Sequence, residues 1–240
     1  MKRHIPNTLT LLNLACGVLA ILFIVQDQLD YCIVALGLSL AFDFLDGMVA
    51  RLLKVSSPIG KELDSLADMV SFGVVPGLIM ARLILETQGE AFPPESLASG
   101  NFLWFAGVLV AMFSGMRLAK FNVDTRQSDS FIGVPTPANT LLILSFWIIV
   151  EKYPDNFLNG AIQNTWFLVG MAVLLSYLLV SELPLIALKF KTWSFGPNRF
   201  RYILIGASLL LFGFLSAPAI PFIILLYICL SIIQLQFVKD

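Results

Sequence analysis

The stretch Asp43-Phe-Leu-Asp46-Gly47-Met-Val-Ala50-Arg51 is followed, after eight residues, by Gly60-Lys-Glu-Leu-Asp64-Ser-Leu-Ala-Asp68. Both halves lie in segments that are otherwise apolar enough to span a membrane. A carboxylate at the centre of a bilayer costs about 2.5–3.5 kcal/mol on insertion scales, so four unpaired carboxylates would cost on the order of 10 kcal/mol. We therefore expect a cation to neutralise them.

The spacing places the four aspartates on two helical faces. Asp43 and Asp46 are three residues apart, and Asp64 and Asp68 are four residues apart, so each pair shares one face of its helix. At a rise of about 1.5 Å per residue, the pairs are separated along the helix axis by about 4.5 Å and 6 Å. Such carboxylates suit hard divalent cations, including two ions about 3.5–4 Å apart as in phosphoryl-transfer sites.

Small residues beside the carboxylates predict room for a large ligand. Gly47 and Ala50 remove bulk from the carboxylate face, and Gly60 opens the following helix, so a ligand can approach the backbone there. Arg51 adds a fixed cation whose planar fork suits phosphate. Metal ions, an arginine and bare backbone together indicate a site for a pyrophosphate.

The complete pattern, Asp-x-x-Asp-Gly-x-x-Ala-Arg, eight residues, then Gly-x-x-x-Asp-x-x-x-Asp, resembles the signature of the CDP-alcohol phosphatidyltransferases, a family of integral membrane enzymes. The resemblance implies that a CDP-linked lipid or alcohol gives its phosphatidyl group to an acceptor hydroxyl and releases CMP. It also implies metal ligands (Asp43, Asp46, Asp64 and Asp68), a general base (Asp68 again), a CDP-binding surface (Gly47, Ala50, Arg51 and Gly60) and a homodimer. Because only hard oxygen ligands are offered, we expect Mg²⁺ or Mn²⁺, as two ions.

A structural alternative is that the aspartates only pair with Arg51, Lys54 and Lys61 at a helix end. Ionisable residues inside membranes are functional by default, which favours the metal site.

The composition indicates a polytopic membrane protein. Of its 240 residues, 58% are hydrophobic and 13% are charged, whereas about a quarter of the residues in soluble domains are charged. A net charge of −1 implies no general attraction to nucleic acid. The three cysteines lie in apolar segments without disulfide or metal spacing, so they are expected to pack as small hydrophobic residues.

Hydropathy predicts an all-α transmembrane bundle of eight spans, at residues 7–25, 31–53, 61–85, 102–121, 138–150, 166–188, 202–215 and 218–237. The first six form the expected catalytic core, residues 1–190, and the last two a C-terminal hairpin, residues 191–240. Pro76 and Pro184 fall inside predicted spans and are expected to kink them. Pro6-Asn7-Thr8 reads as the start of the first helix.

The distribution of lysine and arginine predicts the orientation. With a cytoplasmic N terminus, only Arg82 and Lys152 fall on the far side of the membrane, and every other lysine and arginine falls on the cytoplasmic side. Asp46 then lies about seven residues, or about 10 Å, below the cytoplasmic end of its helix. A lipid could keep its acyl chains in the bilayer while its polar head reaches the aspartates.

Four further stretches, residues 5–10, 71–76, 117–122 and 131–138, resemble the phosphatidylserine synthase branch of the family, although Lys120 stands where an arginine is expected. This branch uses CDP-diacylglycerol and L-serine. Arg117, Lys120 and Arg126 could hold the serine carboxylate, or equally the phosphate of glycerol 3-phosphate or inositol phosphate, or merely fix the topology.

A cation-coupled transporter is the alternative from another functional class. Secondary transporters usually contain repeated halves, and the sequence holds one copy of the aspartate pattern, which argues against transport.

Overall fold

The structure is a computed structural model that describes residues 4–55, 57–94, 102–124, 131–186 and 194–238. The elements, in chain order, are α1 (His4–Val25), α2 (Leu29–Leu53), α3 (Pro58–Met69), the π-helical turn η1 (Val70–Val74), α4 (Val75–Glu86), the short 3-10 helix η3 (Leu103–Phe105), α5 (Ala106–Val123), β1 (Phe131–Ile132), α6 (Thr136–Lys152), α7 (Asn159–Ile162), α8 (Thr165–Val180), β2 (Pro184–Leu185), α9 (Phe195–Leu215) and α10 (Ala219–Val238). The two strands have two residues each, and the all-α prediction is confirmed.

Every predicted span contains helix. Among the described residues, five helical stretches are long and apolar enough to cross a membrane: His4–Val25, Leu29–Leu53, Pro58–Glu86, Leu103–Val123 and Asn198–Leu215. The stretches Thr165–Val180 and Ala219–Gln234 are apolar but shorter, and α6 has 17 residues. The protein is thus a helical membrane protein, as the composition predicts.

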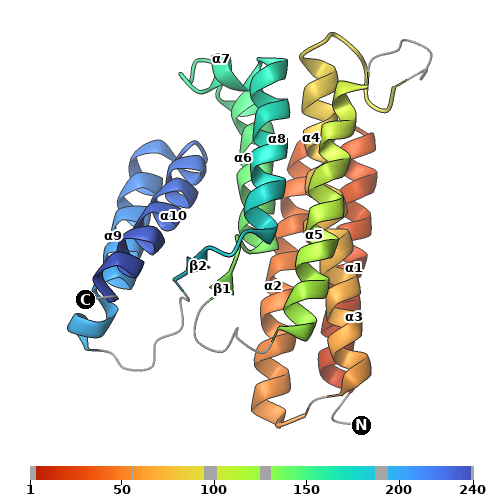
Figure 1. Cartoon of the computed structure of the whole chain (residues 1–240). Coiled ribbons are helices and arrows are strands. Elements are labelled where there is room, and N and C mark those ends of the chain that lie inside the picture. The colour runs from red at the N-terminus through yellow and green to blue at the C-terminus, as the bar shows by residue number, and fades with distance from the viewer. Residues whose placement is uncertain (1–3, 56, 95–101, 125–130, 187–193, 239–240) are drawn as a thin grey trace.

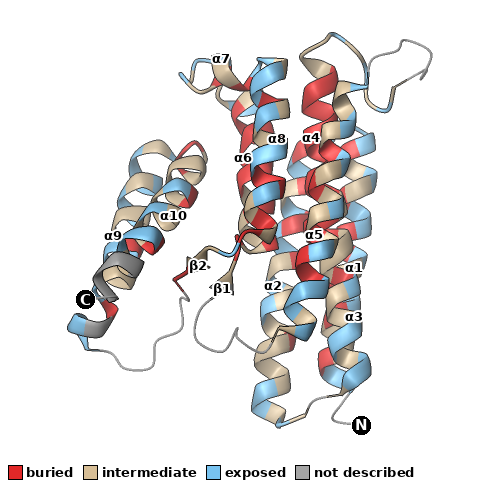
Figure 2. Cartoon of the chain, viewed as in Figure 1, coloured by how far each residue is buried: buried red, intermediate tan, exposed pale blue. Residues whose placement is uncertain are grey.

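The long helices α1 to α6 and α8 stand side by side as one bundle, and α9 and α10 form a hairpin beside it (Figure 1). Helix α4 is buried along nearly all of its length, and most of α6 is buried as well, whereas α8 buries one face and exposes the other (Figure 2). The core around α4 includes the fully buried Ile79, Met80, Ile84, Ile143 and Trp147. Helix α2 runs along this frame, and its aspartate-bearing half lies with α3 at one end (Figure 1).

A π-helical turn lies directly before Pro76, where a kink is predicted. Proline has no N–H group, so the helical hydrogen bond to the carbonyl four residues earlier, that of Phe72, cannot form. The Thr140 hydroxyl, from α6, lies 3.3 Å from that carbonyl oxygen and donates to it. The chain therefore continues as helix through η1 into α4, directly after Asp68.

The sixth predicted span, residues 166–188, is wrong at its C-terminal end. Helix α8 ends at Val180, and Pro184 lies in β2, paired with Ile132 of β1. Gly133 makes this pairing possible: its φ is +75°, and an added Cβ would lie 2.5 Å from the Leu179 carbonyl oxygen. The strand pair joins the start of α6 to the end of α8.

Close backbone contact between α4 and α5 depends on two glycines. A Cβ added at Gly107 would lie 2.4 Å from the carbonyl oxygen of Gly77, and one at Gly77 would lie 2.8 Å from that of Gly107. Small residues at such crossings are how membrane helices approach closely.

A buried arginine links several elements at the end of the bundle opposite the aspartates. The Arg82 guanidinium donates to the Ile24 carbonyl oxygen at 3.1 Å and forms ion pairs of 2.5 Å with Asp27 and with Glu86. It also lies 4.6 Å from the centre of the Trp147 ring. We call these four side chains the Arg82 clasp; it joins the turn after α1 to α4 and α6.

The C-terminal hairpin docks on β2 through polar contacts. Ser231 accepts a hydrogen bond from the Ile186 N–H at 3.1 Å, and the Tyr227 hydroxyl donates to the Ile186 carbonyl oxygen at 3.1 Å. Leu209 and Phe214 on α9 are strongly exposed, as lipid-facing residues would be. The predicted domain boundary between residues 190 and 191 lies outside the described residues and stays a prediction.

Candidate active site

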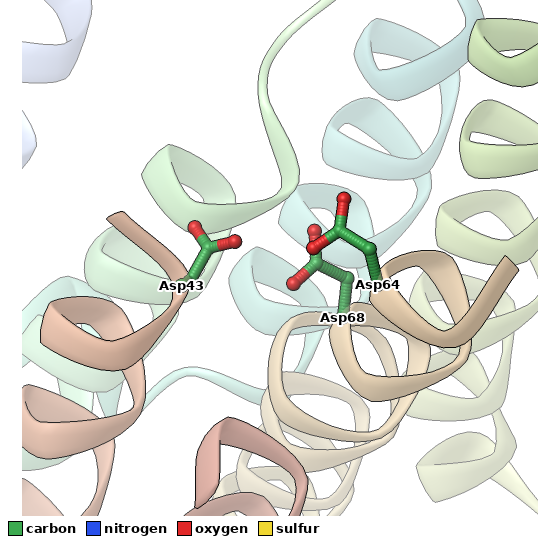
Figure 3. A group of neighbouring side chains, drawn as sticks. All are labelled: Asp43, Asp64 and Asp68. Carbon is green, nitrogen blue, oxygen red and sulfur yellow. The ribbon is translucent and has the colours of Figure 1, made fainter. Parts of the chain in front are cut away.

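Three of the four signature aspartates meet between α2 and α3. Asp43, Asp64 and Asp68 each offer a carboxylate oxygen, and these oxygens all lie within 4.8 Å of one another. Figure 3 shows Asp43 on one helix facing the other two across the gap between the helices. The i, i+4 spacing of Asp64 and Asp68 puts both on the same face of α3.

Local backbone signals set the two helices in place. Helix α2 ends where Lys54 takes the left-handed conformation, with φ +52°. Helix α3 begins with Ser57 as its cap, whose hydroxyl accepts a hydrogen bond from the Gly60 N–H at 3.0 Å, and with Pro58 in the first turn.

The aspartate group fits a divalent cation. Oδ1 of Asp64 is buried and has no hydrogen-bond partner among the described residues. Leaving such an atom unpaired in the interior is costly, and carboxylate oxygens are the donors that Mg²⁺ and Mn²⁺ prefer. The arrangement can therefore hold a metal ion between α2 and α3.

Asp46 is not one of the three residues whose oxygens lie within 4.8 Å of one another, but it interacts electrostatically with each of them. It is buried, and its Oδ2 accepts a hydrogen bond of 2.5 Å from the Thr10 hydroxyl of α1. Its predicted role as a metal ligand stays a prediction.

Helix α1 contributes polar residues that the sequence analysis missed. Asn13 Nδ2 donates to Oδ1 of Asp68 at 3.1 Å, and the Ser39 hydroxyl of α2 donates to Oδ1 of Asn13 at 2.6 Å. The signal was present in the spacing: Thr10 and Asn13 are three residues apart in an apolar helix, and Ser39 precedes Asp43 by one turn. The expectation that Pro6-Asn7-Thr8 starts the first helix was wrong by a few residues, because α1 already begins at His4.

A cavity of about 260 Å³ opens beside the aspartates. Its wall includes three of the predicted CDP-binding residues, Gly47, Ala50 and Gly60, together with Asp46 and Asp64. Small side chains and exposed backbone there leave space for a ligand next to the carboxylates, as the sequence predicts.

Of the predicted CDP-binding residues, Gly60 lines this cavity where two helices meet, whereas Arg51 is not one of its lining residues. A Cβ added at Gly60 would lie 3.0 Å from Ser57 Oγ and 3.1 Å from Asn7 Oδ1, so α1 and α3 approach closely there. Arg51 is exposed at the end of α2, and its Nη1 would lie 3.7 Å from a Cβ on Gly47. The guanidinium is thus near the cavity wall.

Lys61 bonds a backbone carbonyl, whereas the structural alternative has it pair with the aspartates. Lys61 Nζ donates to the Asn122 carbonyl oxygen of α5 at 2.6 Å, and Asn122 Nδ2 donates to Ser65 Oγ at 2.8 Å. These contacts fix α3 against the end of α5.

Arg117 and Lys120, two of the three predicted acceptor-binding residues, border one small cavity of about 30 Å³. Arg117 is buried, its Nη1 donates to Thr136 Oγ1 at 3.4 Å, and its Nε has no hydrogen-bond partner among the described residues. It interacts electrostatically with Asp68. Lys120 is exposed, and Arg126 lies outside the described residues.

Comparison with known proteins agrees with this geometry. The family model described as CDP-alcohol phosphatidyltransferase matches residues 3–186. A Helicobacter pylori protein named CDP-diacylglycerol–serine O-phosphatidyltransferase is 36% identical over 180 residues, covering 74% of this chain and 70% of the relative. Proteins of the same name from Mycobacterium leprae and Bacillus subtilis are 30% and 36% identical; they cover 94% and 60% of this chain, and 72% and 76% of their own lengths.

The aspartate signature, the cavity beside it and the match over residues 3–186 lead to one conclusion. The chain belongs to the CDP-alcohol phosphatidyltransferase family of membrane enzymes, which use divalent metals.

Proposed function

We propose that this enzyme transfers the phosphatidyl group of CDP-diacylglycerol to the hydroxyl of L-serine, which yields phosphatidylserine and CMP. The observation that carries the proposal is the group of Asp43, Asp64 and Asp68 oxygens beside a cavity walled by Gly47 and Gly60. The names of the relatives from three bacterial genera support serine as the acceptor.

The residues divide the reaction between them. The serine oxygen forms a bond to the phosphatidyl phosphorus while the bond from that phosphorus to the CMP oxygen breaks, and the serine proton passes to Asp68. Asp43, Asp46 and Asp64, with Asp68, would hold two Mg²⁺ or Mn²⁺ ions. Bound divalent ions neutralise the pyrophosphate and the charge that develops on the leaving CMP. Gly47, Ala50, Arg51 and Gly60 would hold the CDP moiety.

The acceptor binds on the side of Asp68 that faces Arg117. The electrostatic interaction between these two residues supports this location, since a serine whose carboxylate pairs with Arg117 would have its hydroxyl near the base. Lys120 and Arg126 would add positive charge around the same carboxylate.

The N terminus and the active site face the cytoplasm in this proposal, as the lysine and arginine distribution favours. CDP-diacylglycerol enters from the bilayer, serine and CMP exchange with the cytoplasm, and two copies of the chain form a homodimer. Light scattering of the purified protein measures the mass of the assembly.

An acceptor screen on purified protein tests the function. CMP release from CDP-diacylglycerol is followed with serine, glycerol 3-phosphate, inositol and inositol phosphate in turn, with Mg²⁺ or Mn²⁺ and after chelation. We expect release with serine only, and its loss on chelation. Release with a different acceptor alone would reassign the substrate, and cation flux without any CMP release would favour the transporter.

A further inference from the structure

Asn13 occupies the centre of a buried polar chain that no part of the proposed reaction uses. It lies in the middle of α1, is fully buried, and bonds through both ends of its amide: Nδ2 to Asp68 on α3 and Oδ1 to Ser39 on α2. Ser39 is fully buried as well. One side chain thus ties together the two helices that carry the aspartates.

The chemistry of the partners fixes which way the Asn13 amide points. An ionised carboxylate can only accept hydrogen bonds, so the NH₂ group has to face Asp68. The opposite orientation would place the amide oxygen against the carboxylate. The Ser39 hydroxyl, 2.6 Å from Oδ1, donates a hydrogen bond that holds the favourable orientation.

The backbone of Asn13 is held in register with Asp68 by a second contact. The Ser71 hydroxyl, in the π-helical turn after Asp68, donates to the Asn13 carbonyl oxygen at 3.2 Å. Gly17, one turn along α1, faces the same serine, and a Cβ added there would lie 2.3 Å from Ser71 Oγ. Helix α1 therefore lies tightly against the segment that carries Asp68.

A purely structural role would make Asn13 an interhelical hydrogen-bonding residue that only stabilises the membrane bundle. That role explains the Ser71 contact, but it does not require Nδ2 to bond a signature carboxylate whose neighbours are candidate metal ligands. Outer-shell partners of such ligands orient them, and their loss lowers metal affinity or activity by about 10–100-fold.

We propose that Asn13 is a positioning residue for Asp68, and that Ser39 acts through Asn13 by setting the direction of its amide. The proposal rests on the proposed role of Asp68 as the base. Because Asn13 holds Oδ1 of Asp68, it sets the direction in which this carboxylate faces Asp43 and Asp64, where the serine proton would be taken.

A four-protein cycle tests this: the wild type, Asn13→Ala, Ser39→Ala and the double variant. For Asn13→Ala we expect kcat of serine-dependent CMP release to fall about 10–100-fold, with KM for serine and binding of CDP-diacylglycerol within about threefold of the wild type. The fall in kcat should be smaller for Ser39→Ala than for Asn13→Ala. The double variant should be no slower than Asn13→Ala alone, because the Ser39 hydroxyl, among the described residues, hydrogen-bonds to Asn13 and not to Asp68.

Matched controls and a second variant pair separate positioning from packing. Ser176→Ala on α8 removes a buried serine whose hydroxyl, in the part of the chain that the structure describes, bonds only the Ala172 carbonyl oxygen of its own helix, and it should keep the wild-type kcat. If Asn13→Ala does not fold, Ser39→Thr should recover most of the kcat that Ser39→Ala loses, since it keeps the hydroxyl.

Two results would overturn the proposal: multiplicative losses of kcat in the double variant, or a kcat of Asn13→Ala that stays within about threefold of the wild type while thermal stability falls. Failure of the proposed function looks different, because the wild type itself would then release no CMP with serine.

Discussion

At the scale of single residues, Oδ1 of Asp64 supports the metal site most directly. It is a buried carboxylate oxygen without a hydrogen-bond partner among the described residues. Asp64→Asn should fold normally, because it removes a charge that the protein alone does not neutralise. It should lower CMP release by more than the about 10–100-fold typical of outer-shell changes. Asp30→Asn is the control, since Asp30 is exposed and pairs with Lys152 away from the site.

Rates of CMP release at saturating Mg²⁺ or Mn²⁺, with thermal unfolding measured in parallel, check this prediction. An Asp64→Asn protein as active as Asp30→Asn would make the aspartate group structural.

Thr10 helps to fix the position of the Asp46 side chain. Its hydroxyl lies 2.5 Å from Oδ2 of Asp46 and 3.1 Å from the Pro6 carbonyl oxygen. Thr10→Val keeps the shape and leaves Asp46 without this donor, so we expect about a 10–100-fold loss of activity. Thr10→Ser keeps the hydroxyl and should stay within a few-fold of the wild type. Equal rates of CMP release for the two variants would contradict the prediction.

At the scale of elements, the sequence predicted what depends on neighbours along the chain. The end of α2 at Leu53 follows from hydropathy. That Asp64 and Asp68 face Asp43 follows from helical periodicity and from the resemblance to the family signature. The end of α8 was missed because it depends on pairing between β1 and β2, far apart in sequence. The Asn13 contact was missed for the same reason, since α1 meets α3 only in three dimensions.

The crossing of α4 and α5 gives a prediction about stability. Gly107→Ala places a methyl group 2.4 Å from the Gly77 carbonyl oxygen, so the helices must separate. Overpacking of this kind costs about 1–3 kcal/mol, and the midpoint of thermal unfolding in detergent should fall. Gly170→Ala on α8 is the matched control: nothing lies within 4 Å of its added Cβ, and alanine favours helix over glycine. A midpoint for Gly107→Ala equal to that of Gly170→Ala would show that the crossing tolerates a side chain.

At the scale of the whole molecule, the bundle has two unlike ends. The aspartate end holds a cavity bordered by glycine and polar side chains, while α4 fills the middle of the bundle with buried apolar residues (Figure 2). The hairpin of α9 and α10 lies to one side and contacts α6 and β2, away from the aspartates (Figure 1). The candidate active site thus lies at one end of the bundle, and the rest of the bundle is mainly apolar, as a membrane environment requires.

The Arg82 clasp lies at the end opposite the aspartates and bears on the side from which water-soluble reactants enter and leave. Ion pairs to Asp27 and Glu86 and a ring contact with Trp147 hold the far ends of α1, α4 and α6 together. A second cavity of about 260 Å³ lies beside Glu86 at this end, and the buried apolar residues of α4 lie between it and the aspartates. We therefore expect a water-soluble reactant to leave at the aspartate end, where it entered. In vesicles sorted for one protein orientation, serine supplied on the side of the aspartate end should yield CMP in that compartment alone. CMP in the opposite compartment would mean that the end of the bundle at the Arg82 clasp opens during turnover.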